Sequence, residues 1–316
     1  MPGYAGNRAC VGEQRVTIES LQSQLDAFDQ AALYASDNFQ RRAEVIDAIA
    51  FEIIDRIDGL LGYPSQPRKL RSLRHSAERQ MRRLQAVDER VFQDLRSLIR
   101  GGCRGEPLRQ IIERLVGVHA ADAEGQVVVG YDRLDRLVTG ILDNDHLPEP
   151  RLEPEPEMVL NQRTPARIIF ELVRRANLGP QDCFYDLGSG MGQVTTLVHL
   201  LSGAAAKGVE FEPAFCEYAR ARAAALSLTQ VEFVNADARR ADYAKGNIFY
   251  MYTPFEGSML LEVLERLRER SRSTPIRLAT FGSCTAIVAQ QGWLSAPSPA
   301  EPGSYRLAIF SSHGRR

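Results

Sequence analysis

The sequence of 316 residues lacks the features that mark secreted or membrane-spanning proteins. Its five cysteines are scattered and form no C-x-x-C pair, which argues against a disulfide framework or a zinc site and favours a reducing compartment. No apolar run approaches the roughly 20 residues that a membrane helix needs. The N-terminus, MPGYAGNRACVGEQRV, also lacks the basic and then apolar pattern of a signal peptide. We therefore predict a cytoplasmic protein that binds no membrane.

Recognisable metal-binding and nucleophile patterns are missing as well. The five histidines show no metal-ligand spacing such as H-x-x-x-H, and no Ser-His-Asp or Cys-His arrangement stands out, so we predict no metal. A net charge of −1 gives no global reason to bind nucleic acid. One segment differs, because residues 68–104 hold eleven arginines or lysines against four acids. It is either a solvated helical face or a landing surface for an acidic partner, nucleic acid or protein.

The first half of the chain reads as helices. Within residues 40–61, apolar side chains recur every three or four positions with charges between them. The same period recurs in residues 76–100, 107–116 and 131–142. We predict a helical N-terminal domain or cap over residues 1–146, with 131–142 as its contact to the rest. Residues 147–157, LPEPRLEPEPE, are rich in proline and glutamate and predict a stiff linker or an extended strap.

After this linker, strand patterns alternate with helix patterns. Expected helices cover residues 165–176, 192–201, 213–226 and 257–270. Expected strands cover CFYDLG (183–188) and residues 205–211, 231–237, 247–255, 276–282 and 305–312. Such alternation predicts an α/β fold with a doubly wound, parallel, Rossmann-like sheet over residues 158–316.

The stretch DLGSGMGQ, residues 186–193, follows the first expected strand and opens a helix. Glycines there let a ligand approach the backbone, and the helix directs free N–H groups at it. A dinucleotide fingerprint needs G-x-G-x-x-G, whereas this chain has G-x-G-x-G with an acid two residues ahead, which would repel a pyrophosphate. That pattern favours S-adenosylmethionine, which carries an ammonium group and no phosphate. The candidate contacts are Asp186, Gly188, Ser189, Gly190, Gly192 and Gln193.

Two later acids fit the same ligand. Glu210 ends the second expected strand, where a carboxylate can accept from both ribose hydroxyls. Asp237 ends the third and can accept from an adenine amino group, while Phe211 or Ala238 covers the adenine face. Both acids could instead be helix or turn caps. A nicotinamide enzyme would also want Glu210, so that residue alone does not discriminate.

With these residues in place, the chain resembles the class I S-adenosylmethionine-dependent methyltransferases over roughly residues 158–316. FYDLGSGMGQVTTLVHLL followed by KGVEFEPAFCEYAR is most similar to the disruptor-of-telomeric-silencing type of histone lysine methyltransferase domain. The resemblance implies that the glycine loop surrounds the methionine moiety, that Glu210 binds the ribose and that Asp237 lies near the adenine. It also implies a loop over the cofactor at 157–167, with Gln162 and Thr164 as contacts.

The chain departs from that family after the fourth strand, where YMYTPFEG replaces asparagine-rich residues, and no lysine-rich tail follows. A histone substrate is therefore not supported, and a bacterial-looking relative with another acceptor is expected. Tyr252, Thr253 and Phe255 occupy the position of an amino-methyltransferase motif and are the candidate catalytic residues. We predict N-methylation of an amine such as a protein lysine. A small-molecule N- or O-methyltransferase and a non-catalytic cofactor-binding scaffold are the alternatives.

Overall fold

The computed structural model describes residues 17–61, 66–117, 132–143, 148–159, 162–295 and 306–313. The chain forms two compact units, Met1–Asp88 and Glu89–Arg316, and the boundary lies within helix α4 (Pro67–Arg100). This boundary lies elsewhere than the linker predicted at 147–157. The division into a helical domain, a linker and a catalytic domain therefore stays a prediction. Among the described helices, none is long and apolar enough to cross a membrane.

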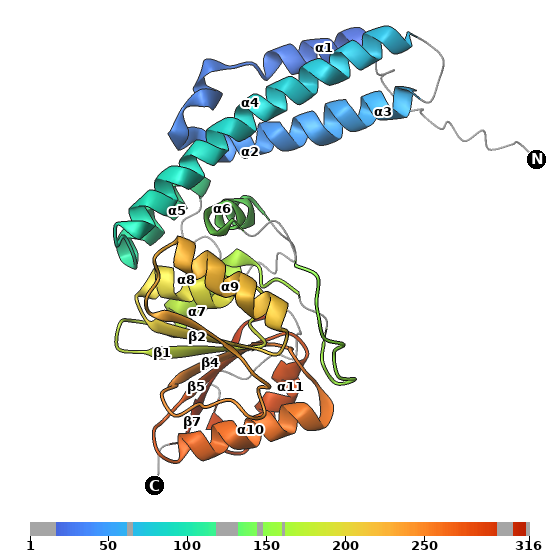
Figure 1. Cartoon of the computed structure of the whole chain (residues 1–316). Coiled ribbons are helices and arrows are strands. Elements are labelled where there is room, and N and C mark those ends of the chain that lie inside the picture. The colour runs from blue at the N-terminus through green and yellow to red at the C-terminus, as the bar shows by residue number, and fades with distance from the viewer. Residues whose placement is uncertain are drawn as a thin grey trace, which may run out of the picture. The chain divides into compact units, whose positions relative to one another are not determined.

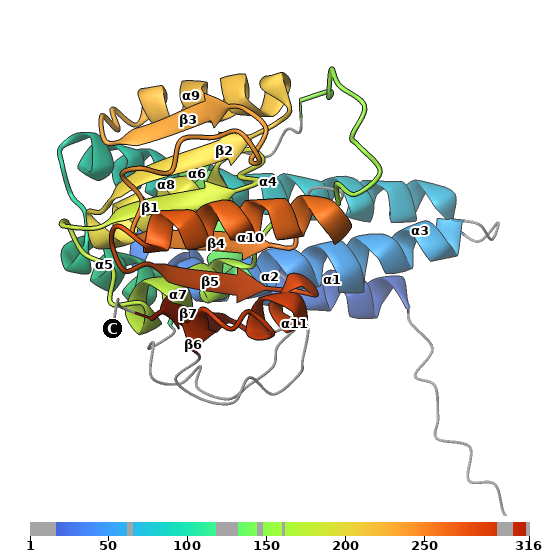
Figure 2. The ribbon, with the colours of Figure 1, turned by 90° about the horizontal axis from the view of Figure 1, so that it is seen from below.

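The first unit is helical. Its elements are α1 (Ile18–Ala27), η1 (Ala31–Tyr34), η2 (Ser36–Asn38), α2 (Phe39–Ala48), η3 (Ile49–Ile54), α3 (Asp55–Leu61) and the first part of α4. Figures 1 and 2 show α1, the α2–α3 segment and this part of α4 running side by side. Their apolar faces form one buried cluster, which includes Leu21, Leu33, Ile49, Ile57 and Leu84. The predicted helical period thus has its expected cause, a core-facing stripe.

The segment predicted as one helix over 40–61 contains a change of helical type. Between α2 and α3, the six residues of η3 form a π-helical turn. A π turn holds more residues per turn than an α-helix, so it rotates the following residues around the helix axis. Ile49, Ile53 and Ile57 stay buried across it, whereas Phe51 is exposed.

The second unit is built around a seven-stranded sheet. Its helices after α4 are α5 (Glu106–Val116), α6 (Arg133–Leu142), α7 (Ala166–Arg175), α8 (Gln193–Ser202), α9 (Pro213–Ala225), α10 (Gly257–Ser271) and α11 (Cys284–Ala289). Its strands are β1 (Cys183–Leu187), β2 (Ala205–Glu210), β3 (Val231–Asn235), β4 (Ile248–Tyr252), β5 (Arg277–Phe281), β6 (Leu294–Ser295) and β7 (Ala308–Ser312). The fold is the predicted α/β class. Residue 305 of the last expected strand lies outside the described residues.

The strand order is β3-β2-β1-β4-β5-β7-β6. Helices α7, α8 and α9 cover one face of the sheet, and α10 and α11 cover the other (Figures 1 and 2). Strands β1 to β5 are parallel, as predicted, but β7 runs antiparallel to both β5 and β6. The prediction of a wholly parallel sheet is therefore wrong at this edge. At this edge β7 lies between β5 and β6, and the sequence pattern did not reveal β6 because it is only two residues long.

Helices α5 and α6 pack on the helical layer of the second unit, where α5 contacts α8 and α6 contacts α7. The Asp135 carboxylate of α6 accepts a hydrogen bond from the Ala166 backbone N–H, at 2.8 Å, and thereby caps the start of α7. Burial raises the pKa of Asp135. The segment predicted at 131–142 to contact the rest of the chain does contact it, although residue 131 lies outside the described residues.

This topology fixes where a ligand can bind. The chain runs outward from β1 to β2 and β3 on one side and to β4 and β5 on the other. Open α/β sheets bind ligands at such a switch point, beside the carboxyl ends of the strands. The glycine loop follows β1 at this point.

Candidate active site

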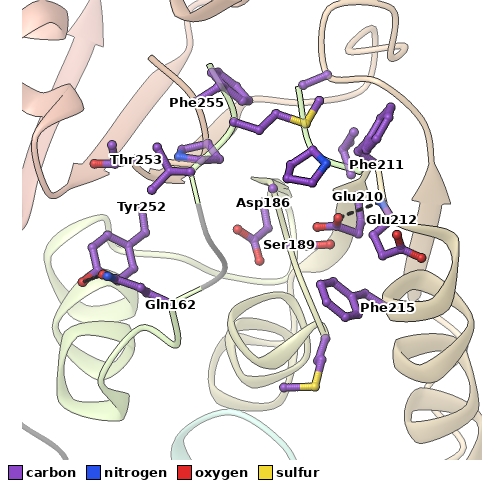
Figure 3. A pocket seen from close by; sticks show the side chains of 18 of the residues that line it. Gln162, Asp186, Ser189, Glu210, Phe211, Glu212, Phe215, Tyr252, Thr253 and Phe255 are labelled. Carbon is purple, nitrogen blue, oxygen red and sulfur yellow. Dashed lines mark hydrogen bonds between the residues drawn. The ribbon is translucent and has the colours of Figure 1, made fainter. Parts of the chain in front are cut away.

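A cavity of about 450 Å³ lies at the carboxyl ends of β1, β2 and β4. Figure 3 shows Asp186 and Ser189 near its middle, Glu210, Phe211 and Phe215 toward one end, and Gln162 and Tyr252 toward the other. Thirteen of the fifteen predicted site residues line it: Gln162, Thr164, Asp186, Gly188, Ser189, Gln193, Glu210, Phe211, Asp237, Ala238, Tyr252, Thr253 and Phe255. Gly190 and Gly192, the other two, shape the loop beside the cavity.

The glycine loop needs glycine for two physical reasons. Gly188 and Gly192 have φ values of 77° and 79°, which disfavour residues with a side chain. A Cβ at Gly188 would lie 2.4 Å from the Cβ of Pro254, and one at Gly192 would lie 2.4 Å from the Phe233 ring. The loop thus packs directly against the segment after β4 and against β3.

Asp186 is the most perturbed carboxyl of the cavity. Its side chain is buried and accepts a hydrogen bond from the Thr195 hydroxyl at 2.9 Å. Burial raises the pKa of Asp186 to about 7, because no cation among the residues that the structure describes compensates for the lost hydration. A ligand ammonium group in the cavity would supply that missing charge.

Glu210 closes the loop from the side of β2. One carboxylate oxygen accepts from the Gly190 N–H at 2.7 Å, and the other accepts from the Glu212 N–H at 2.9 Å. Each oxygen keeps acceptor capacity for a ligand hydroxyl. The Gly190 N–H is already paired with a carboxylate, so it is not free for a pyrophosphate. This contact argues against a nicotinamide dinucleotide and fits a ribose.

Asp237 does not stand alone at the adenine end. Arg239 holds its carboxylate through hydrogen bonds of 2.7 to 3.1 Å, and this contact lowers the pKa of Asp237. Ala238 and Phe211 line the same end of the cavity. Both can offer apolar surface to a base.

Five residues at the other end are joined by hydrogen bonds. The Gln193 amide donates to the Thr164 carbonyl at 3.0 Å, and the Thr164 hydroxyl lies 3.1 Å from the Tyr250 hydroxyl. The Tyr252 hydroxyl donates to Oε1 of Gln162 at 3.0 Å. These pairs tie α8 and β4 to the segment before α7, which carries the predicted cofactor loop. Residues 160 and 161 of that loop lie outside the described residues.

Strand β4 is shorter than the strand predicted over residues 247–255, because it ends at Tyr252. Thr253 has a φ of 38°, a left-handed conformation that is strained for a β-branched residue. Its hydroxyl accepts from the Cys284 N–H at 3.2 Å and donates to the Phe281 carbonyl at 3.3 Å. The Thr253 side chain therefore holds the turn that places Tyr252 and Phe255 in the cavity wall.

Residues 148–159, which we call the strap, form part of the wall, and only 157–159 belong to the loop that the sequence predicted over the cofactor. Pro150, Leu152, Pro154, Met158 and Val159 all line the cavity. Met158 forms an isolated β-bridge with Phe255, and the Val159 N–H donates to the Pro254 carbonyl. The Pro/Glu composition allowed either a linker or a strap, and the structure has the strap. Phe215, a further wall residue, carries no signal beyond its position near Glu210.

The cavity suits S-adenosylmethionine by its chemistry. It offers buried carboxylates for an ammonium group and for hydroxyls, apolar walls for a base, and a buried Ser189 hydroxyl without a hydrogen-bond partner. Within the described ranges, no group of three or more His, Cys, Asp or Glu side chains is placed to hold a metal ion.

The basic segment also has a defined structure. It covers most of α4, where Arg68, Arg71, Arg79, Arg82 and Arg83 are exposed. Several of its arginines have partners on the protein. Among them, Arg74 pairs with Asp58 and Glu78, and Arg96 donates to the carbonyls of Gly140 and Ile141.

Comparisons with known proteins show what this chain is similar to. The chain matches the family described as histone methylation protein DOT1 over residues 163–248. The comparison with curated proteins gives no match. Similar solved structures include an RNA methyltransferase from Salinibacter ruber with S-adenosyl-L-homocysteine, at 22% identity over 48% of this chain and 92% of that chain, with a TM-score of 0.38. Another is the putative methyltransferase yhhF from Escherichia coli, at 15% identity over 50% of this chain and 92% of that one, with a TM-score of 0.41.

The matched residues contain β1, the glycine loop, Glu210 and Asp237, which are the parts that surround the cavity. The cofactor is S-adenosylmethionine, and the protein is a class I S-adenosylmethionine-dependent methyltransferase related to the DOT1 family.

Proposed function

We propose that this enzyme methylates an amine nitrogen, such as the side-chain nitrogen of a protein lysine. The observation that carries the proposal is the position of residues 252–255, which line the same cavity as Asp186 and Glu210. They bring aromatic walls to the place where an acceptor would meet the cofactor. The proline and the aromatic residue of an amino-methyltransferase motif are both present, as Pro254 and Phe255.

The cofactor residues have separate tasks in this proposal. Asp186 pairs with the ligand ammonium group, and Glu210 accepts from the ribose hydroxyls. Asp237 accepts from the adenine amino group, with Phe211 and Ala238 against the ring. The methionine end lies near Gly188, Ser189 and the Gln162, Thr164 and Gln193 side chains.

S-adenosylmethionine supplies, when bound, a methyl group on a positively charged sulfur. The protein then has to align the acceptor and to exclude water. The Tyr252 ring contacts the Phe281 ring, with centroids 4.8 Å apart, and its hydroxyl is held by Gln162. Phe255 is buried and bridged to Met158, so both aromatic walls are fixed. An amine beside such walls loses its proton more readily than in water, because burial disfavours the charged form. The Tyr252 hydroxyl or carbonyl can accept a hydrogen bond from the neutral amine.

The test is transfer of labelled methyl to cell-extract proteins and to lysine-containing peptides, followed by complete acid hydrolysis. We expect methyl-lysine in the wild type, and at least a tenfold lower transfer rate with an unchanged Kd for S-adenosylhomocysteine in Tyr252→Phe. Label only in the small-molecule fraction would favour a small-molecule methyltransferase. Cofactor binding without any transfer would favour the scaffold alternative.

A partner for the exposed basic residues of α4 belongs to the same proposal. A stripe of arginines with few acids suits an acidic partner, either nucleic acid or protein, that presents the acceptor. A cytoplasmic location and a catalytic domain over residues 158–316 stay predictions.

A further inference from the structure

Arg239 joins two parts of the cofactor site that lie far apart in the sequence. Its guanidinium contacts Asp237, two residues away, and Glu155 in the strap, 84 residues away. The Nη2 atom donates to Glu155 at 2.8 and 2.9 Å and to Asp237 at 2.7 Å. The three side chains are partly buried, with exposed fractions of 25% for Arg239, 43% for Glu155 and 15% for Asp237.

These contacts nearly fill the acceptor capacity of Asp237. Its carboxylate receives three protons from Arg239: the backbone N–H at 2.8 Å, the Nε–H and one Nη2–H. A carboxylate has about four acceptor sites, so one remains. The planar guanidinium also fixes the carboxylate in one orientation, which a lysine at this position could not do.

We propose that Arg239 is a positioning residue that makes Asp237 a single, oriented acceptor for the 6-amino group of adenine and fastens the strap beside it. The inference rests on the proposed place of adenine at Asp237. Neither Arg239 nor Glu155 lines the cavity, so each acts through a neighbour. The two contacts of Arg239 have separable consequences.

The Asp237 contact governs selectivity for the base. An oriented carboxylate rejects a 6-oxo base, because two acceptors would then face each other without a proton. Without Arg239 the carboxylate can turn away or take up water, so the rejection weakens. The Glu155 contact holds only the strap. Its loss should therefore lower the affinity for every cofactor analogue by the same factor.

The strap has other attachments that serve as controls. Arg151 pairs with Glu217 at 2.7 Å, and both side chains are more than half exposed. Glu157 accepts from the Ser258 and Met259 N–H groups at the start of α10. Neither pair touches Asp237, so removing Arg151 tests strap attachment without disturbing the acceptor.

The experiment is calorimetric titration of the full chain with S-adenosylhomocysteine and with S-inosylhomocysteine, in which a 6-oxo group replaces the amino group. For the wild type we expect about tenfold or greater preference for the adenosyl compound. In Arg239→Ala and Arg239→Gln the ratio should fall to roughly a third or less of the wild-type value. In Glu155→Gln both affinities should fall by a similar factor while the ratio stays, and Arg151→Ala should change the ratio by less than about twofold.

The inference is overturned if folded Arg239→Gln keeps the wild-type ratio, or if the wild type does not distinguish the two compounds. Either outcome leaves the methyltransferase assignment intact when S-adenosylhomocysteine binds. Failure of the wild type to bind S-adenosylhomocysteine would instead remove the cofactor site itself. Use of two variants keeps the test decisive if Arg239→Ala does not fold.

Discussion

Asp186 is the residue whose protonation should control cofactor binding. Burial raises its pKa from 3.8 to about 7, so the cofactor-free protein holds a proton there at mildly acidic pH. A cationic ammonium group favours the carboxylate, and below pH 7 that proton must leave on binding. We expect the affinity for S-adenosylhomocysteine to fall about tenfold between pH 8 and pH 6, measured by calorimetry in buffers of different ionisation enthalpy.

The matched variants for this prediction are Asp186→Asn and Asp242→Asn, the latter at an exposed aspartate outside the cavity. Asp186→Asn should bind weakly and with little dependence on pH, whereas Asp242→Asn should follow the wild type. The sign for stability is opposite to that of a salt-bridged acid. A raised folded pKa means that ionisation of Asp186 opposes folding increasingly from about pH 4 to pH 7. The melting temperature of Asp186→Asn, relative to that of the wild type, should therefore be higher at pH 8 than at pH 5. A pH-independent wild-type affinity would contradict the role of Asp186.

At the scale of elements, hydrophobic periodicity and the order of helices and strands along the chain predict most of the fold. The strands and helices around the glycine loop follow from short-range pattern, because each buries one face against its neighbours. The antiparallel direction of β7 and the π turn η3 were not visible in the sequence. Strand direction is not encoded in a local pattern, and Ile49, Ile53 and Ile57 stay buried at four-residue spacing across the π turn.

Some features of the candidate site could likewise be predicted from the sequence, and others could not. Asp186, Glu210 and Asp237 could be found because each lies at or just beyond the carboxyl end of a strand, where topology brings side chains together. Thr253 was expected at the site from its motif position, but its left-handed backbone conformation could not be predicted. Threonine is disfavoured in that conformation, and tertiary contacts impose it. The pair of Arg239 and Glu155 was equally hidden, as no local pattern joins residues 84 positions apart.

Helix α4 carries the element-scale prediction. Arg79 and Arg82 are exposed on its basic stretch, and Arg56 is an exposed arginine of α3. If the stretch contacts a nucleic acid, Arg79→Glu with Arg82→Glu should weaken binding of duplex DNA and lower the slope of log K against log salt by about 2. Fluorescence anisotropy over a salt series measures both. Arg56→Glu is the control. An equal loss of binding in Arg56→Glu, or no DNA binding by the wild type, would exclude duplex DNA as the specific partner of α4.

At the scale of the whole molecule, the first unit has a buried charge pair of its own. Arg42 is fully buried, pairs with Asp88, and donates to the Leu33 and Ala35 carbonyls at 2.9 and 2.7 Å. Removing one partner of such a pair strands the other charge and costs about 3–5 kcal/mol. Replacing both with apolar residues avoids that cost.

The fluorescence of the single tryptophan reports on the unfolding of the second unit alone, because Trp293 lies in that unit and packs against its core. Each unit has its own hydrophobic cluster, so we expect them to unfold separately. Arg42→Met should lower the denaturant midpoint of the helical circular dichroism signal but leave the Trp293 fluorescence midpoint and the Kd for S-adenosylhomocysteine within twofold of the wild type. Arg42→Met with Asp88→Leu should restore the first midpoint. If both midpoints shift together in Arg42→Met, the two units unfold as one cooperative unit. The stability of the cofactor site would then depend on the folding of the helical residues before α5.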